Sequence, residues 1–456
     1  MSGWGRSQQG GALGALLWAV AVIGIVAALV TAYAVVGPRP TDFAGGTRVP
    51  LPQYQAADPS GVPAELRQAS LVERGAYLAS AADCMVCHTA KDGVPYAGGR
   101  AFVLPFGTLY STNITSDPET GIGRYTDAQF LAALHQGVGR DGTRLYAAMP
   151  YASYTYMSDA DGLAIKAYLL TLPPVHAPAP ANSLTFPFNQ RALMGIWALL
   201  FDADKRFEPD VGRSATWNRG AYLVEAMGHC GECHTPRNLF FALDNRRKFA
   251  GALQAGWRAY NITPDPSSGV GTWSDADLAH YLSLGHADGR GTASGPMGEA
   301  VDASLSRLLP ADIEAMVAYL RSVPAVATPD LPAPRTDPVP AGTASMASDG
   351  MDPRGVAVYE GACAGCHGWT GVSPVLPLAT LTGTRAVNDP TATNVAQIVI
   401  GGAQRHPVLA PTNMPAFGRA YSDAEIASVA NYVTARFGAK GSDLTAAKVA
   451  ELRALD

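Results

Sequence analysis

The sequence predicts a mainly α-helical protein in which one N-terminal transmembrane helix precedes three tandem copies of a small helical domain. Three observations lead to this fold class. An apolar, uncharged run lies near the N-terminus, a long stretch of sequence occurs twice and a shorter form of it occurs a third time, and all six cysteines fall in three copies of one five-residue motif. The length of 456 residues agrees, since it is enough for about three domains of ordinary size.

The first predicted element is a transmembrane anchor at residues 11–36. Residues 13–36 carry no charge, and a helix of roughly 20 apolar residues spans a bilayer. A cleaved signal peptide is the alternative, with Ala32-Tyr33-Ala34 as a cleavage site, but its apolar region would be shorter, at about 7–15 residues. Both interpretations send the rest of the chain across the membrane. We therefore expect a single-pass protein of the inner membrane with its other domains in the periplasm.

The repeat defines the domains that follow. It opens with Arg-Gly-Ala-Tyr-Leu at residues 74–78 and 219–223, and both long copies contain Asn-Ile-Thr followed by Asp-Pro. Each copy is predicted to run helix, cysteine motif, loops, helix, loop, helix, and Thr126, Ser274 and Ser422 are expected N-caps. The predicted divisions are copy 1 at 68–174, a linker with an apolar helix candidate (186–201) at 175–212, copy 2 at 213–325, a Pro-rich linker at 326–350, copy 3 at 351–438 and a tail at 439–456.

Each copy contains one C-x-x-C-H motif, which is the attachment signal of c-type haem. The two thiols are spaced to add across the vinyl groups of one porphyrin, and the histidine is placed to bind the iron. Thioredoxin-like redox sites or zinc half-sites explain neither the histidine nor the odd number of cysteine pairs. The sequence thus predicts three class I-like cytochrome c domains with three covalent haem c groups. The haem-binding residues are Cys84, Cys87, His88, Cys230, Cys233, His234, Cys363, Cys366 and His367.

The second axial ligand of each iron is predicted to be a methionine, because His/Met ligation raises the reduction potential and suits electron transfer. Met149, Met297 and Met414 each precede the last helix of their copy. Met157 competes in copy 1, but it directly precedes a helix start, and Met316 lies within a predicted helix and is expected in the core. The histidines outside the motifs do not recur at matching positions, so we expect them at the surface or around the sites: His135, His176, His229, His280, His286 and His406.

The composition of the chain and the absence of certain motifs exclude several other classes of protein. The net charge of −5 gives no basic surface, so nucleic acid is not an expected partner. No dinucleotide-binding, serine-hydrolase or zinc-protease motif is present. We expect an electron-transfer subunit without a catalytic site of its own. The alternative is a haem enzyme such as a peroxidase, in which one iron would lack a sixth ligand.

Residues 71–438 resemble the tri-haem cytochrome c subunits of bacterial membrane-bound dehydrogenases. The resemblance is carried by R-G-A-Y-L before the haem motif, G-H-C-G-E-C-H-T-P-R-N at 228–238 and W-N-R-G-A-Y-L-V-E-A at 217–226. It implies a separate catalytic subunit that oxidises an alcohol, aldehyde, gluconate, sorbitol or fructose, and transfer of the electrons to ubiquinone or the respiratory chain. An N-terminal span resembles cytochromes that serve molybdopterin-dependent aldehyde dehydrogenases, so this partner is favoured, with alcohol and sugar dehydrogenases as alternatives.

The order of the copies suggests a direction of electron flow. The anchor precedes copy 1, which places copy 1 nearest the bilayer. Residues 324–340 contain many prolines and few large apolar residues, a composition typical of semi-rigid linkers. We expect copy 3 to extend on this linker, to receive electrons from the catalytic subunit, and to pass them through copies 2 and 1 towards membrane quinone.

Overall fold

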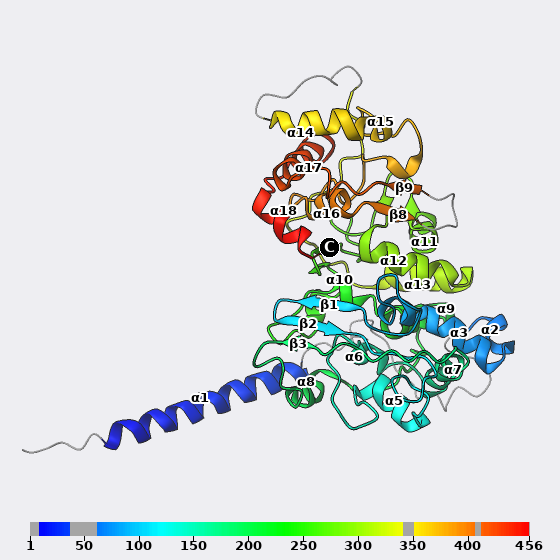
Figure 1. Cartoon of the computed structure of the whole chain (residues 1–456), viewed down its shortest axis with the longest axis vertical. Helices are drawn as coiled ribbons and strands as arrows, with labels where there is room; N and C mark the ends of the chain where they lie inside the picture. The colour runs from blue at the N-terminus through cyan, green and yellow to red at the C-terminus, as the bar shows by residue number, and fades with distance from the viewer. Residues whose placement is uncertain (1–8, 37–61, 341–350, 406–411, 456) are drawn as a thin grey trace, which may run out of the picture.

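The computed structural model describes residues 9–36, 62–340, 351–405 and 412–455, and its regular structure is mainly helical (Figure 1). Helix α1 (Gln9–Val36) points away from the remaining helices, and its C-terminal end lies beside α8 (Leu193–Phe201). Apolar side chains along its middle, such as Leu16 and Trp18, are exposed. No helix in the described ranges reaches the length and apolarity required to cross a membrane. The transmembrane assignment of residues 11–36 therefore stays a prediction.

Copies 1 and 2 share the main helices and the hairpin, and copy 2 has additional short elements between them. Copy 1 has α2 (Ala64–Gln68), α3 (Leu71–Ala81), α4 (Cys84–Cys87), β1 (Ala101–Leu104), β2 (Gly107–Tyr110), α5 (Asp127–Gln136), α6 (Tyr151–Tyr154) and α7 (Asp159–Leu169). Copy 2 has α9 (Ala215–Tyr222), η3 (Leu223–Met227), α10 (Gly231–His234), η4 (Asn245–Arg247), β4 (Ala252–Gln254), β5 (Trp257–Ala259), α11 (Asp275–Leu284), β6 (His286–Ala287), β7 (Gly291–Thr292), α12 (Gly295–Ala303), η5 (Leu305–Arg307) and α13 (Pro310–Ser322).

Copy 3 is shorter but follows the same plan. It has α14 (Pro353–Val358), η6 (Tyr359–Cys363), α15 (Ala364–His367), η7 (Pro377–Ala379), α16 (Thr393–Gly401), β8 (Ala403–Arg405), β9 (Thr412–Met414) and α17 (Asp423–Phe437), and α18 (Ala446–Arg453) follows in the tail. The predicted N-caps are confirmed: Thr126, Ser274 and Ser422 each accept a backbone hydrogen bond and form a capping box.

The strands form only small antiparallel sheets, which the sequence analysis did not predict. In copy 1, β1 pairs with β2 and β2 pairs with β3 (Ser183–Leu184) of the following linker. In copy 2, β4 pairs with β5 at the corresponding place. Each of these hairpins follows a cysteine motif, so it lies in the chain between the haem-attachment residues and the second long helix.

In every copy, the opening helix crosses the closing helix at a glycine. A Cβ atom at Gly75 would lie 1.9 Å from the carbonyl oxygen of Ala164, and one at Gly220 would lie 1.9 Å from that of Ala315. The same contact in copy 3 joins Gly355 and Ser428 at 2.3 Å. Only glycine allows the helices to approach this closely. The tyrosine of the closing helix packs beside this glycine in each copy.

The buried apolar side chains form two clusters. One contains residues of both copy 1 and copy 2, from Leu78 to Val323. The other contains residues of copy 3 and the C-terminal tail, together with Val339 of the linker. Copies 1 and 2 therefore share one continuous core, while copy 3 has its own. The division of the chain into three separate domains stays a prediction.

Both linkers differ from their predicted structures. In residues 186–201, only α8 is helical, and the Phe186-Pro187 bond before it is cis. Trp197 on α8 donates a hydrogen bond to the carbonyl oxygen of Phe240 in copy 2, but Leu199 is 83% exposed. The expectation that copy 3 extends on its linker is wrong for residues 324–340, because Val339 packs in the core of copy 3 and the carbonyl oxygen of Pro332 accepts a hydrogen bond from Arg385 of copy 3. Residues 341–350 of that linker lie outside the described ranges.

Candidate haem sites

The cysteines of each motif lie on a short helical turn. Cys84 begins α4 and Cys87 ends it, and α10 and α15 contain the second cysteine of the other motifs. Side chains three residues apart lie on the same face of a helix, so each pair of thiols is presented together. None of the six cysteines forms a disulfide, so both members of each pair are available to one haem. Burial raises the pKa of Cys84 and of Cys230 to about 12.

The three motif histidines are oriented in the same way. The Nδ1 atom of His88 lies 2.6 Å from the carbonyl oxygen of Thr112, that of His234 lies 2.6 Å from Tyr260, and that of His367 lies 2.6 Å from Ala379. Since a carbonyl oxygen only accepts, Nδ1 must donate its proton, which leaves the lone pair on Nε2 for a metal ion. Burial also lowers the pKa of each histidine, which favours the neutral ring.

The repeated Asn-Ile-Thr segment holds the carbonyl group that orients the histidine. Thr112 directly precedes Asn113, whose Oδ1 accepts hydrogen bonds from the backbone and side chain of Thr115 and whose Nδ2 donates to the carbonyl oxygen of Val175 at 2.6 Å. In copy 2, Asn261 makes the same contacts with Thr263 and Val326. The repeat of this motif is visible in the sequence, but its role is not, because Val175 and Val326 lie far from it in the chain.

The three predicted methionine ligands lie at the edges of the cores. Met149 and Met297 are half-buried against the cluster of copies 1 and 2, beside which Cys84 and Cys230 also pack. Met414 and Cys363 have the same relation to the cluster of copy 3. Met157 and Met316 are instead buried completely within the core, as expected for Met316. Iron ligation by Met149, Met297 and Met414 stays a prediction.

The remaining histidines within the described ranges do not form a metal site. His135 on α5 is buried, and burial lowers its pKa to about 4. His176 is exposed, and His286 contacts Asp288. His406 lies outside the described residues. Among the described side chains, no group of three or more histidine, cysteine, aspartate and glutamate residues could hold a metal ion. The histidine and methionine donors, the free thiols and the apolar surroundings fit haem c.

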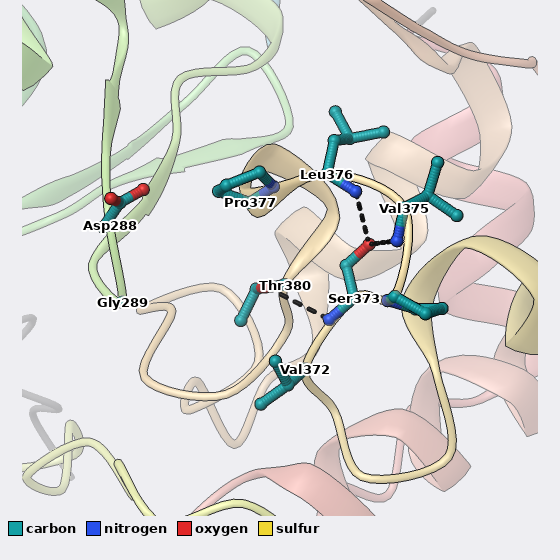
Figure 2. Close-up of a pocket in the computed structure, with 9 residues that line it drawn as sticks. Asp288, Gly289, Val372, Ser373, Val375, Leu376, Pro377 and Thr380 are labelled. Atoms are coloured by element: carbon teal, nitrogen blue, oxygen red, sulfur yellow. Dashed lines mark hydrogen bonds between the residues drawn. The ribbon is translucent and has the colours of Figure 1, made fainter.

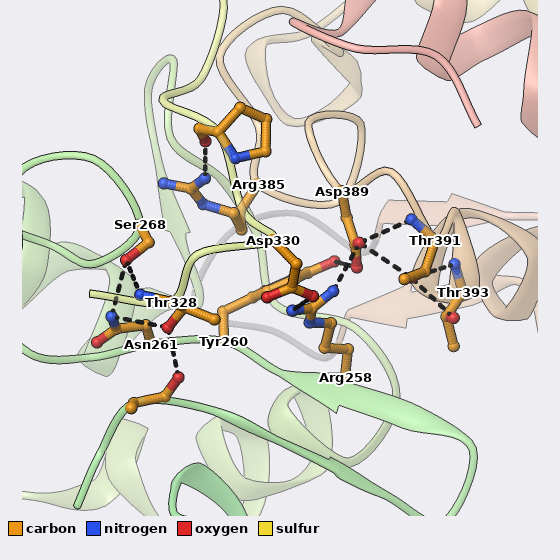
Figure 3. A network of polar contacts seen from close by, with 12 residues as sticks. Arg258, Tyr260, Asn261, Ser268, Thr328, Asp330, Arg385, Asp389, Thr391 and Thr393 are labelled. Carbon is orange, nitrogen blue, oxygen red and sulfur yellow. Dashed lines mark hydrogen bonds and ion pairs between the residues drawn. The ribbon is translucent and has the colours of Figure 1, made fainter. Parts of the chain in front are cut away.

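Copies 2 and 3 are joined by polar contacts next to the site of copy 2 (Figure 3). Arg258 forms ion pairs with Asp389 at 3.0 Å and with Asp330 of the linker at 2.5 Å. The hydroxyl of Tyr260 donates to Asp389 at 3.2 Å, while the carbonyl oxygen of the same residue faces His234. Tyr260 thus connects the histidine of copy 2 to copy 3, a role that the sequence did not reveal.

A pocket of about 280 Å³ lies where copies 2 and 3 meet (Figure 2). It is lined by Asp288 and Gly289 of copy 2 and by Thr380 and residues 372–377 of copy 3. The lining loop leads to Ala379, the carbonyl partner of His367. The pocket therefore borders the loop that orients the third histidine.

Comparisons with known proteins agree with this geometry. The family model for cytochrome c matches residues 72–173 and 353–436. The chain is 40% identical over 410 residues to the fructose dehydrogenase cytochrome subunit of Gluconobacter japonicus, covering 84% of this chain and 82% of that protein. It is 38% identical over 402 residues to the gluconate 2-dehydrogenase cytochrome c subunit of Pantoea cypripedii, covering 84% and 90%.

The chain belongs to the family of dehydrogenase cytochrome c subunits. Covalent haem c is therefore its cofactor, and its role is electron transfer for a catalytic dehydrogenase subunit. The chain is also 38% identical over 261 residues to a protein of Cereibacter sphaeroides described as "Diheme cytochrome c-type". The aligned region covers 56% of this chain and 86% of that protein.

Proposed function

We propose that the chain carries three covalent haems and relays electrons from a periplasmic dehydrogenase subunit to ubiquinone. The observation that carries the number three is the recurrence of one geometry, a pair of free thiols followed by a histidine whose Nδ1 lies 2.6 Å from a carbonyl oxygen. A site that were only a sequence accident would have no reason to share this arrangement with the others.

The haem count is tested by acid-acetone extraction of the purified protein, because thioether bonds survive this treatment. We expect three haems per chain in the pyridine haemochrome assay of the extracted protein. A value of two or fewer would contradict the proposal. Changing one cysteine pair at a time to serine should lower the count to two in each variant.

The residues present would divide the work at each site between three groups. Haem, when bound, supplies a one-electron redox couple. The cysteines would hold it covalently, the histidine, with its ring fixed by the carbonyl, would be one iron ligand, and Met149, Met297 or Met414 would be the other. A methionine ligand at each iron would leave no position for a substrate, which favours electron transfer over the peroxidase alternative.

The membrane location is also part of the proposal. We assign residues 11–36 as a single-pass anchor in the inner membrane and place copies 1 to 3 in the periplasm. Support comes from the uncharged run of residues 13–36 and from the exposed apolar side chains along α1. Ile196 and Leu199 of α8, the helix that contacts α1, are exposed as well, so this end of the molecule offers apolar surface to a bilayer.

For the catalytic partner we keep the molybdopterin-dependent, aldehyde-oxidising type, supported by the N-terminal apolar run. The relatives named above serve fructose and gluconate dehydrogenases, which makes a sugar-oxidising partner the direct competitor. Purification of the native complex in detergent distinguishes them. Aldehyde-dependent haem reduction with bound molybdopterin supports our choice, whereas reduction by a sugar, a sugar acid or an alcohol alone excludes it.

We further propose that electrons enter at copy 3 and leave through copies 2 and 1. Copy 3 and α1 lie at opposite ends of the molecule (Figure 1), and the loop beside the third site carries exposed apolar side chains, Val372 and Val375. Apolar patches of this kind mark protein contact sites. The contacts of copy 3 with Arg258 and Tyr260, beside His234, support passage of electrons between copies 3 and 2.

The direction of flow is tested in the complex with the catalytic subunit. Changing Cys363 and Cys366 to serine should leave two haems and abolish their reduction by substrate. The matched variant, with Cys84 and Cys87 changed to serine, should also keep two haems, which are still reduced. Reduction at the normal rate in the first variant would contradict entry at copy 3.

A further inference from the structure

Copies 1 and 2 each contain an ion pair between their first and last helices. In copy 1, Arg74 on α3 contacts Asp161 on α7 at 2.5 Å. In copy 2, Arg219 on α9 contacts Asp312 on α13 at 2.8 Å. The two arginines open the repeated Arg-Gly-Ala-Tyr-Leu segment, so these pairs occupy equivalent positions in the two copies.

The tyrosine of each repeated segment reaches the ion pair of the other copy. Tyr77 of copy 1 donates a hydrogen bond to Asp312 at 2.6 Å, and Tyr222 of copy 2 donates to Asp161 at 2.6 Å. Each hydroxyl also accepts a hydrogen bond from the backbone N–H of the N-cap residue of the closing helix in the other copy. Tyr77 accepts from Leu309 at 3.0 Å, and Tyr222 accepts from Ser158 at 3.1 Å. The two copies thus exchange equivalent contacts. We call these the crossed tyrosine contacts.

Copy 3 lacks the crossed tyrosine contacts. The residue three positions after its Arg354 is Ala357, where copies 1 and 2 have tyrosine. Arg354 pairs with Asp352 on its own helix end, and Glu425 caps its own helix. Because copy 3 builds the same helix crossing without the tyrosine, folding of a single copy does not require it. The crossed tyrosine contacts serve the pairing of copies 1 and 2.

The same interface brings the two cysteine motifs together. Ser153 of copy 1 donates to Glu232, which lies between the cysteines of copy 2, at 2.8 Å. Arg100 donates a hydrogen bond to the carbonyl oxygen of Val86, which lies inside the first motif. The same side chain forms an ion pair with Glu299 of copy 2 at 2.7 Å. These two contacts place the first and second cysteine motifs at the same interface between copies 1 and 2.

The helices that carry the tyrosines lead directly into these motifs. Helix α3 ends at Ala81, just before Cys84, and α9 continues through η3 to Met227, just before Cys230. Rotation of α3 against α9 would change the separation of the two attachment sites. The crossed tyrosine contacts oppose this rotation at two symmetrical points.

We propose that Tyr77 and Tyr222 are positioning residues for direct electron transfer between the haems of copies 1 and 2, which they hold at a fixed separation and orientation. This inference rests on the proposed function, since it requires a haem in each copy. The step is an exchange of one electron, in which one iron passes from the ferrous to the ferric state as the other is reduced. No bond forms or breaks, and no proton moves.

The test replaces both tyrosines by phenylalanine in the full-length protein with its haems attached. Phenylalanine keeps the packed ring and removes only the hydroxyl. Two haems held close and at a fixed angle couple in the Soret circular dichroism spectrum, and a laser-flash experiment measures the exchange rate between them. We expect three haems in the variant, with the coupled Soret signal and the exchange rate each lowered at least two-fold, and smaller losses in the single variants.

Tyr359→Phe is the matched control, because its hydroxyl donates to Gly368 within copy 3 at 2.5 Å. It should leave the exchange between copies 1 and 2 unchanged. An unaltered Soret signal and exchange rate in the Tyr77→Phe/Tyr222→Phe variant would overturn the inference. Equal losses of signal and rate in the Tyr359→Phe control, or loss of a haem from the double variant, would overturn it as well. A wild-type protein with fewer than three haems would instead refute the proposed function.

Discussion

Arg219 and Asp312 are bound to each other by two hydrogen bonds of 2.8 Å, and their side chains are only 2% and 0% exposed. The equivalent arginine of copy 1, Arg74, is 33% exposed. The two copies therefore contain the same ion pair in different surroundings, and this difference has a consequence for stability.

We expect Asp312→Ala to destabilise the protein by about 3–5 kcal/mol, because it leaves the charge of Arg219 buried without its partner. Asp161→Ala should cost less, since water can reach Arg74. The measurement is denaturant unfolding of the haem-loaded protein, followed by the Soret band. Equal decreases in the free energy of unfolding of the two variants would show that burial does not govern the strength of these ion pairs.

The weak far-red band of methionine bound to ferric haem reports the sixth ligand. Each haem would contribute one such bond, so changing Met149, Met297 or Met414 to alanine should lower the band by about a third. Met157→Leu and Met316→Leu are the controls and should leave it unchanged, because both side chains are buried in the core. A full band in any of the three alanine variants would remove that methionine from the ligand set.

Asp83 makes stability depend on pH. Burial, with a further contribution from the charge of Glu299, raises its pKa from 3.8 to about 8. A carboxyl group whose pKa is raised on folding stabilises the folded protein at low pH. This contribution is lost progressively as the pH rises from about 4 to 8.

Asp83→Asn should therefore stabilise the protein relative to wild type at pH 8, and the advantage should shrink as the pH falls towards 5. Asparagine suits the position, since Asp83 has a φ of 54°, in a region that asparagine tolerates. Unfolding free energies measured across this pH range provide the check. Curves that stay parallel would mean that Asp83 does not titrate there.

Attachment to the membrane should resist salt. A helix formed by residues 13–36 would be held by the hydrophobic effect rather than by charge, so the protein should leave the membrane fraction only with detergent. Replacing residues 1–36 by a cleavable signal peptide should yield a soluble cytochrome with its haems. A mature N-terminus located just after Ala34 would identify the segment as a signal peptide instead.

Local sequence predicted much of each copy. The repeated Arg-Gly-Ala-Tyr-Leu segment predicted an opening helix in copies 1 and 2, where the structure has α3 and α9. Serine and threonine caps predicted the starts of α5, α11 and α17. These features depend on residues close together in the chain, and so they can be inferred before the fold is known.

Contacts between the copies could not be inferred in this way. Linker composition suggested that copy 3 extends away, yet Arg335 donates its backbone N–H to Asn388 and Arg385 donates to the carbonyl oxygen of Pro332. Proline content describes the stiffness of an isolated chain but not the partners that its carbonyl groups find. The apolar linker helix was also predicted too long, since the chain reaches helical geometry only after Pro187.

The sequence by itself determined the cofactor chemistry, because the spacing of two thiols and a histidine is fixed by the covalent structure of one haem. It also determined the repeated plan of each copy. Only the tertiary structure decided that copies 1 and 2 share a core, that Tyr77 and Tyr222 bind the carboxylates of the opposite copy, and that Tyr260 connects His234 to Asp389. The physical reason is that these hydrogen bonds join residues far apart in the chain, more than a hundred positions in the case of Tyr77 and Asp312. Nothing in the sequence around either residue specifies its partner.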